Sequence, residues 1–362
     1  MKASVRLPEL MLVFEGVLSL PGFNILEGRV YPHHPVMEQV PLLAYRVEPE
    51  LLTELCGLRI PLYLDCEAAC NDSSVQQMWG PRSLYPYYRL VASRRYECNE
   101  HEAYLKSGFS HRVVNLPLID DEYPEHVAVY QSVLRAKKSF HMMELGARWG
   151  TWGARAIAFL RMVNPMPYQM AFMESLLLHC AALKKVMLLN DIQYSLACSE
   201  VSVDAFLQLM PKGVHVDLLH IDIQGAEDAF LANDAIQNIL RSNVYRLVVG
   251  THTPDIHAGV LRVYADWLVI LDLPYAATWD CWKPFRLKSI PALRVNDSWR
   301  NVPGPEDWEL LRQEKCYHQT PQGAVANFDG LLVLDNPRFV DSRRAFSFND
   351  AELRVEDLRP LA

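Results

Sequence analysis

From about residue 126 onward, short apolar runs alternate with amphipathic stretches of helix length. That alternation is typical of βαβ units, in which parallel strands form one sheet and helices cover both of its faces. The strand candidates are 139–145, 168–175, 186–190, 216–223, 245–252, 267–273 and 329–336. The helix candidates are 151–163, 176–185 and 203–210. We therefore expect an α/β fold, with about seven mostly parallel strands in an αβα sandwich.

Residues 1–125 lack this alternation and are interrupted by prolines, so we expect an irregular α+β segment there. A chain of 362 residues exceeds one typical domain, so a second unit is expected. We divide the chain into a cap or substrate-selecting segment at 1–125, an α/β domain at 126–340 and a C-terminal tail at 341–362. Aromatic residues of the first segment could line a neighbouring pocket, but more often form a core: Trp79, Tyr85, Tyr87 and Tyr88.

Charge and hydropathy exclude several classes of partner. The 35 basic residues against 43 acidic ones give a formal net charge of -8, which is the wrong sign for neutralising many phosphates. No window reaches the roughly 18 to 20 uncharged apolar residues of a membrane span. Pro8 precedes the apolar N-terminal run, Glu15 interrupts it and no clean small-x-small cleavage pattern follows, so we interpret it as mature protein rather than a signal peptide. We expect a cytoplasmic protein without nucleic-acid or membrane partners, and the oligomeric state stays open.

The eight cysteines are spread through a chain too large to need disulfide staples. We therefore predict free or buried thiols in a reducing compartment. Cys66 and Cys70 could share one helix face, but no second pair with metal-ligand spacing accompanies them, so they predict no metal site.

The strongest local signal is ELGARWGTWG at 144–153, which lies between a predicted strand and a predicted helix. A glycine at such a turn lets the backbone approach a ligand, and the helix N-terminus offers unpaired N–H groups. Gly146 and Gly150 are therefore candidate cofactor contacts. The turn alone suits either a dinucleotide or S-adenosylmethionine (SAM). Glu144 favours SAM, because a carboxylate there would repel a pyrophosphate but pair with a cationic methionyl group.

Acidic and amide residues follow the later predicted strands. Glu174 ends the second strand, where a carboxylate can accept hydrogen bonds from both ribose hydroxyls. Asn190 and Asp191 end the third predicted strand, within reach of an adenine ring, although such residues also commonly make turns and caps. Asp222 ends an otherwise apolar strand, where leaving it without a partner would be costly.

Four motifs in order resemble the FkbM family of SAM-dependent methyltransferases: ELGARWGTWG, VDLLHIDIQGAE, VVGTHTPDIH and FDGLLVLDNPRF. The resemblance covers about 140–340 and implies a Rossmann-like class I methyltransferase fold, with O-methylation of hydroxyls on sugars or other natural products. It implies that Glu144 and Gly146 line the methionine and ribose side of SAM, Glu174 the ribose, and Asp222 the methionine amine or the reaction centre. Family members often have Asn or Gly where this chain has Arg148, Trp149 and Trp152.

Methyl transfer to a small-molecule hydroxyl needs a group that removes the acceptor's proton. We propose His252, at the end of the fifth strand, as the general base, with His257 or Asp222 as substitutes. Asp222, His252 and His257 could together suit a divalent metal, but we assign none. Trp149 and Trp152 could stack on adenine, although tryptophans near a helix start more often pack against the sheet.

Two other functions compete with this interpretation. The glycine series also resembles that of an NAD(P)-dependent oxidoreductase, but the Tyr-x-x-x-Lys pair of short-chain dehydrogenases is absent from the sequence. A noncatalytic scaffold that retains a SAM pocket is the other alternative. Binding of SAM with turnover, SAM without turnover, or NADPH alone separates the three.

Overall fold

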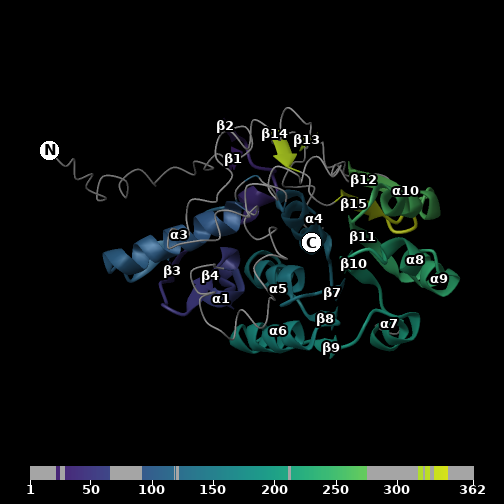
Figure 1. The fold of residues 1–362 in the computed structure, drawn as a ribbon, viewed down its shortest axis with the longest axis horizontal. Coiled ribbons are helices and arrows are strands. Elements are labelled where there is room, and N and C mark those ends of the chain that lie inside the picture. The colour runs from purple at the N-terminus through teal and green to yellow at the C-terminus, as the bar shows by residue number, and fades with distance from the viewer. Residues whose placement is uncertain are drawn as a thin grey trace, which may run out of the picture.

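The structure is a computed structural model that describes residues 22–24, 29–65, 92–117, 119, 122–210, 213–274, 317–320, 323–326 and 330–340 (Figure 1). Its centre is a seven-stranded sheet with the order β12-β15-β11-β10-β7-β8-β9. The strands are β7 (Phe140–Leu145), β8 (Tyr168–Met173), β9 (Ser195–Ala197), β10 (Val216–Ile221), β11 (Val244–Thr251), β12 (Leu268–Leu273) and β15 (Gly330–Asp335).

The strand order identifies the fold class. Numbered along the chain, the strands lie in the order 3-2-1-4-5-7-6, and β15 runs antiparallel between β11 and β12 while the other pairs are parallel. A dinucleotide-binding sheet in its usual form has six parallel strands and no such insertion. The fold is the Rossmann-like fold of class I methyltransferases, as the sequence predicts.

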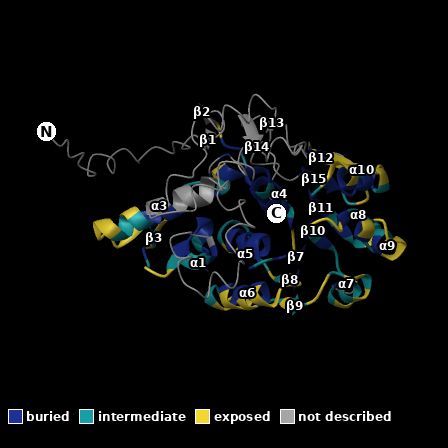
Figure 2. Cartoon of the chain, in the orientation of Figure 1, coloured by how far each residue is buried: buried dark blue, intermediate teal, exposed yellow. Residues whose placement is uncertain are grey.

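Helices cover both faces of this sheet. One face carries α4 (Tyr123–Arg135), α5 (Thr151–Val163) and α6 (Leu177–Leu189). The other carries α7 (Val203–Leu209), α8 (Glu227–Leu231), α9 (Asp234–Asn243) and α10 (Pro254–Val263). Successive strand residues face opposite layers, so Leu218 of β10 belongs to one apolar cluster and Leu219 to the other. Figure 2 shows the resulting buried centre between the helices.

The predicted third strand is wrong. The run VMLLN at 186–190 forms the last turn of α6, and the strand of this unit is β9. The segment contains no proline or glycine that would end the helix at Lys185, so α6 continues to Leu189 and Asn190 is its C-terminal cap. Asp191 then adopts a φ of 51° as the chain turns. A short apolar run suits a strand or a buried helix equally well, and here the helix prevails.

The described N-terminal residues form short strands and helical turns and one longer helix, α3. They are β1 (Gly22–Asn24), β2 (Arg29–Tyr31), η2 (Met37–Gln39), β3 (Ala44–Arg46), β4 (Leu51–Thr53), η3 (Leu55–Gly57), β5 (Arg59–Pro61), α1 (Leu62–Asp65), α3 (Ala92–Ser107) and β6 (His111–Val113). A further hairpin pairs β13 (Tyr317–Thr320) with β14 (Gly323–Ala326). Leu52 and Ile60 share one apolar cluster with Phe159 of α5. The role of this segment in substrate selection stays a prediction, and Trp79, Tyr85, Tyr87, Tyr88 and the tail 341–362 lie outside the described residues.

The prediction of free cysteines is wrong for part of the chain. A disulfide joins Cys180 of α6 to Cys198, just after β9, and Cys98 is also disulfide-bonded. Both ends of the first bridge lie at one edge of the sheet, which brings their Cα atoms to 6.1 Å although 18 positions separate them. Cys56 is free and buried, as predicted. The other four, Cys66, Cys70, Cys281 and Cys316, lie outside the described residues.

The disulfides and the lengths of the helices each bear on a prediction about location. Disulfides persist mainly in oxidising compartments, so the cytoplasmic location, which was inferred in part from free thiols, loses that support. None of the helices in the described part of the chain is long and apolar enough to cross a bilayer.

Candidate active site

The carboxyl ends of the parallel strands bring most of the predicted site residues to one edge of the sheet. Glu174, Asp222 and His252 directly follow β8, β10 and β11, and Glu144 is the penultimate residue of β7. In open α/β sheets this edge is where ligands bind.

Asn190 and Asp191 do not belong to that edge. They follow the C-terminus of α6, which returns the chain to the opposite edge of the sheet before β9 begins. The side chain of Asn190 accepts a hydrogen bond from the Arg59 backbone N–H (2.8 Å) and donates one to the Arg59 carbonyl (2.7 Å). Their predicted contact with adenine is therefore wrong, and Asn190 ties α6 to the N-terminal segment instead.

Glu144 holds the start of α5. The residue is 1% exposed, and its carboxylate accepts hydrogen bonds from the backbone N–H groups of Trp152 (3.1 Å) and Gly153 (2.8 Å). Negative charge at a helix N-terminus is favourable, and these bonds satisfy two otherwise unpaired donors. Burial nevertheless raises the pKa of Glu144 to about 7. In the structure, the Glu144 carboxylate caps the N-terminus of α5. The predicted contact of Glu144 with SAM stays a prediction.

The two glycines of the turn are explained by contacts within the protein. A Cβ on Gly146 would lie 1.7 Å from the backbone oxygen of Asp222, and its φ is +78°. A Cβ on Gly150, with φ +83°, would lie 2.7 Å from Cε of Met187. The absence of a side chain at Gly146 thus lets the loop after β7 touch the loop after β10, a reason that differs from the close ligand approach predicted from the sequence.

The two tryptophans of the turn are core residues. Trp149 is fully buried and Trp152 nearly so, both in the cluster on the α5 face of the sheet. This confirms the more common role for tryptophans at a helix start. Arg148, in the same turn, adopts a φ of 51°.

Glu174 connects the glycine turn to the start of α6. Its carboxylate accepts hydrogen bonds from the backbone N–H groups of Arg148 (2.7 Å) and Leu176 (2.8 Å), and it lies 3.4 Å from Nδ1 of His179. Burial raises the pKa of Glu174, but the contact with His179 and the two backbone hydrogen bonds outweigh it and hold the pKa below its usual value. The group therefore stays charged.

Three leucines beside Glu174 were missed by the sequence reasoning. Leu176, Leu177 and Leu178 are exposed, Leu177 by 73%, at the N-terminus of α6. The signal that could have found them is an apolar run directly after an acidic strand end. These leucines place exposed apolar side chains at the ligand-binding edge of the sheet, next in sequence to a carboxylate.

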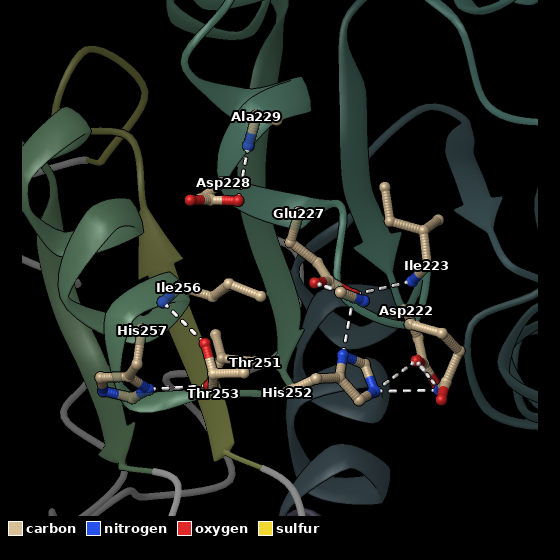
Figure 3. A network of polar contacts seen from close by, with 12 residues as sticks. Asp222, Ile223, Glu227, Asp228, Ala229, Thr251, His252, Thr253, Ile256 and His257 are labelled. Carbon is tan, nitrogen blue, oxygen red and sulfur yellow. Dashed lines mark hydrogen bonds and ion pairs between the residues drawn. The ribbon is translucent and has the colours of Figure 1, made fainter.

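The most concentrated polar cluster joins the ends of β10 and β11 (Figure 3). Nε2 of His252 lies 3.2 Å from Oδ1 of Asp222, and Nδ1 lies 2.8 Å from Oε1 of Glu227. The Gln224 amide nitrogen lies 2.7 Å from the same Asp222 oxygen and 2.9 Å from Nε2 of His252. Glu227 belongs to the HIDIQGAE motif, but no sequence pattern places it against a histidine 25 positions later.

The members of this cluster differ in how far their side chains are exposed to solvent. The Glu227 side chain is fully buried, that of His252 is 13% exposed and that of Asp222 is 32% exposed. Burial raises the pKa of Asp222, but its contacts with His252, His220 and Gln224 outweigh that effect and hold the pKa below its usual value. The cluster therefore presents one charged carboxylate and one imidazole edge toward solvent.

His257 does not join the cluster. Its Nδ1 lies 2.8 Å from the Thr251 hydroxyl and its Nε2 lies 3.0 Å from Asp272, so it points away from His252 (Figure 3). The prediction that His257 could substitute for His252 as base is therefore wrong, as is its grouping with Asp222 and His252 around a metal.

Asp222, Glu227 and His252 do place potential metal-ligand atoms within 4.8 Å of one another. Their two carboxylates, however, face different nitrogens of the same ring. A single ion binds only one ring nitrogen, so this arrangement fits a ring held between two acids better than three ligands on one metal. The assignment of no metal stays a prediction.

Comparisons with known proteins give distant structural similarities. No protein-family model and no curated protein matches the chain. A putative sarcosine dimethylglycine methyltransferase from Galdieria sulphuraria is 9% identical, with 60% of this chain and 84% of that chain covered and a TM-score of 0.35. Precorrin-6y C5,15-methyltransferase from Geobacter metallireducens is 13% identical, with 42% and 76% covered and a TM-score of 0.32.

M. capricolum TrmK in complex with S-adenosyl-homocysteine is 8% identical, with 58% of this chain and 67% of that chain covered and a TM-score of 0.29. These TM-scores are low, so the fold assignment depends on the strand order described above.

Proposed function

We propose that this protein is a SAM-dependent methyltransferase that methylates a hydroxyl of a small molecule, as its resemblance to the FkbM family implies. The observation that carries the proposal is the convergence of Glu174, Asp222 and His252 at the carboxyl edge of a class I methyltransferase sheet.

The residues at this edge fit the parts of SAM. The charged Glu174 carboxylate would accept hydrogen bonds from the ribose, and the exposed leucines 176–178 would cover the adenine ring. Asp222, charged and 32% exposed, would face the cationic methionyl end. A dinucleotide would instead place a pyrophosphate near Asp222 and the buried Glu144, where like charges repel. The carboxylates at this edge therefore favour a cationic ligand.

Bound SAM supplies a methyl group already activated on a sulfonium, so that transfer to an acceptor O–H yields a methyl ether, a neutral thioether and one proton. The chain's task is to align the acceptor and to take that proton. His252 lies beside Asp222 at the mouth of the cluster, and its Nε2 faces the less buried side. We assign the proton acceptance to Nε2 of His252, which then releases the proton to water.

Titration calorimetry with SAM, NADH and NADPH tests this proposal. We expect heat with SAM alone, and SAM affinity lower by about tenfold or more in Glu174→Gln and Asp222→Asn, because each removes a charge-assisted contact. Asp266→Asn is the matched control, since Asp266 pairs with Arg241 near the start of β12, at the opposite edge. Binding of NADPH without SAM heat would overturn the proposal, and SAM binding without methyl transfer to any hydroxyl acceptor would favour the scaffold alternative.

A further inference from the structure

The Cys180–Cys198 disulfide joins two segments of the chain that both contact Glu174. Cys198 directly follows β9, and the residue before it, Ala197, accepts a hydrogen bond from the Glu174 backbone N–H (3.0 Å). Cys180 lies in α6, where its N–H donates to the Leu176 carbonyl (3.0 Å) and closes the first turn of the helix. The bridge therefore ties the start of α6 to the end of β9.

The position of the Glu174 carboxylate, which we assign to the ribose, depends on where α6 starts. The carboxylate accepts the Leu176 N–H (2.8 Å), and one of its oxygens lies 3.4 Å from Nδ1 of His179. Sγ of Cys180 lies 3.5 Å from the Glu174 backbone oxygen. The leucines 176–178, which we place against adenine, belong to the same turn. A shift of this turn would therefore displace the contacts for both parts of the nucleoside.

The first turn of α6 has little other support among the described residues. Its N-cap residue, Leu176, makes no side-chain capping hydrogen bond, and the leucines 176–178 are exposed. The strand at the other end of the bridge, β9, has three residues and lies at the edge of the sheet. Further along α6, the buried side chains of Ala182 and Leu183 anchor the helix. Loss of the bridge should therefore loosen the first turn and leave the rest of α6 in place.

The two cysteines of the bridge differ in accessibility. Cys180 is buried, whereas Cys198 is partly exposed, so a thiolate from solution reaches Sγ of Cys198 first. Its attack breaks the S–S bond and releases Cys180 as a thiolate, which the N-terminus of α6 stabilises until it takes up a proton. With a dithiol as reductant, the second thiol then displaces Cys198. The protein gains two thiols, and the dithiol is oxidised to a disulfide.

We propose that the Cys180–Cys198 bridge is a redox-sensitive control of the SAM site. In the oxidised protein the bridge fixes the first turn of α6, and with it the Glu174 carboxylate and the leucines for adenine. In the reduced protein this turn is released from β9, and SAM binds more weakly. The inference rests on the proposed function, because SAM is the ligand whose affinity changes.

Titration calorimetry with SAM on the full-length protein tests this inference, before and after reduction with dithiothreitol. We expect the affinity for SAM to fall by about fivefold or more on reduction and to return on reoxidation, because a charge-assisted contact is loosened. Cys198→Ser should bind SAM like the reduced wild type, with or without dithiothreitol, since it removes the bridge and leaves the buried Cys180 in place. Cys98→Ser is the matched control: it removes a second disulfide and should keep both the wild-type affinity and the response to the reductant.

Hydrogen exchange of the backbone amides 176–180 in the protein without ligand provides a second readout. Reduction should accelerate exchange in this turn and leave exchange in β10 unchanged. Three results would overturn the inference: equal SAM affinity in the two redox states, exchange that reduction does not alter, or a bridge that dithiothreitol does not open in the folded protein, as measured by alkylation and mass spectrometry. The wild-type comparison decides the matter even where Cys198→Ser fails to fold. Absence of SAM heat from the oxidised protein would instead overturn the proposed function, and the exchange data would then decide whether the bridge controls this turn.

Discussion

Arg155 of α5 forms two hydrogen bonds of 2.8 Å with the carboxylate of Glu54, which lies 101 positions earlier in the chain. Both side chains are nearly fully buried, and Glu122 lies 3.9 Å from the same guanidinium. The helix that follows the glycine turn is therefore fixed to the N-terminal segment by a buried ion pair.

Removing one partner of that pair leaves a buried charge with too little compensation. Glu54→Gln should lower the free energy of unfolding by about 3 kcal/mol, measured by urea denaturation. Glu48→Gln provides the comparison, because the Glu48–Arg59 pair is about a third exposed and its loss should cost less than about 1 kcal/mol. Equal, small losses in the two variants would show that the Arg155–Glu54 pair does not anchor the segment.

Glu144 should make stability depend on pH. Its pKa is raised by burial from 4.5 to about 7, so the unfolded chain releases this proton first as pH increases. The contribution of Glu144 to the free energy of unfolding is fully present below about pH 4.5. It is lost as pH rises from there through 7, a loss of about 3 kcal/mol for this group alone. Glu144→Gln should lose less stability than the wild type between pH 5 and pH 8, as measured by denaturant unfolding. Parallel stability curves for the two proteins would contradict the raised pKa.

Gly146→Ala should be far more damaging than alanine at another glycine with positive φ. At Gly146 the new Cβ meets the Asp222 backbone oxygen, whereas at Gly213, with φ +68°, it meets nothing within 4 Å. Gly213→Ala should cost only the backbone strain, about 1 kcal/mol. Gly146→Ala must also separate the loops after β7 and β10, so we expect it to unfold at lower urea and to lose SAM binding. Similar unfolding midpoints would rule out the loop contact.

The Cys180–Cys198 bridge closes a loop of 18 residues. Replacing both cysteines with serine should lower the free energy of unfolding by about 3 kcal/mol. Mass spectrometry of peptides from the unreduced protein should recover the two cysteines linked. Unlinked peptides and an unchanged denaturation midpoint would return Cys180 and Cys198 to the free thiols that the sequence predicts.

The parts of the fold that were predicted correctly depend on local patterns. The strand before the glycine turn and the helix 151–163 each carry their own apolar period and their own breakers, so β7 and α5 appear where expected. The sequence VMLLN alone does not determine whether the segment forms a strand or a helix. Its packing as part of α6 on the α5 face of the sheet decides for the helix.

The site was predictable at the level of the sheet edge and less so at the level of contacts. Placing Glu174, Asp222 and His252 together needs only the rule that parallel strands end at one edge. Two contacts were not predictable: that of Glu144 with the start of α5 and that of Glu227 with Nδ1 of His252. Both depend on the paths of loops whose backbone N–H groups donate to these carboxylates only in the folded structure.

The central claim is that SAM binds at the carboxyl edge formed by β7, β8, β10 and β11. A crystal structure with S-adenosylhomocysteine measures this most directly. We predict the ribose against Glu174, the adenine over the leucines at the start of α6, and the sulfur on the side of Asp222 and His252. A ligand found near Asn190 at the opposite edge, or Glu174 and Asp222 both without ligand contact, would contradict it.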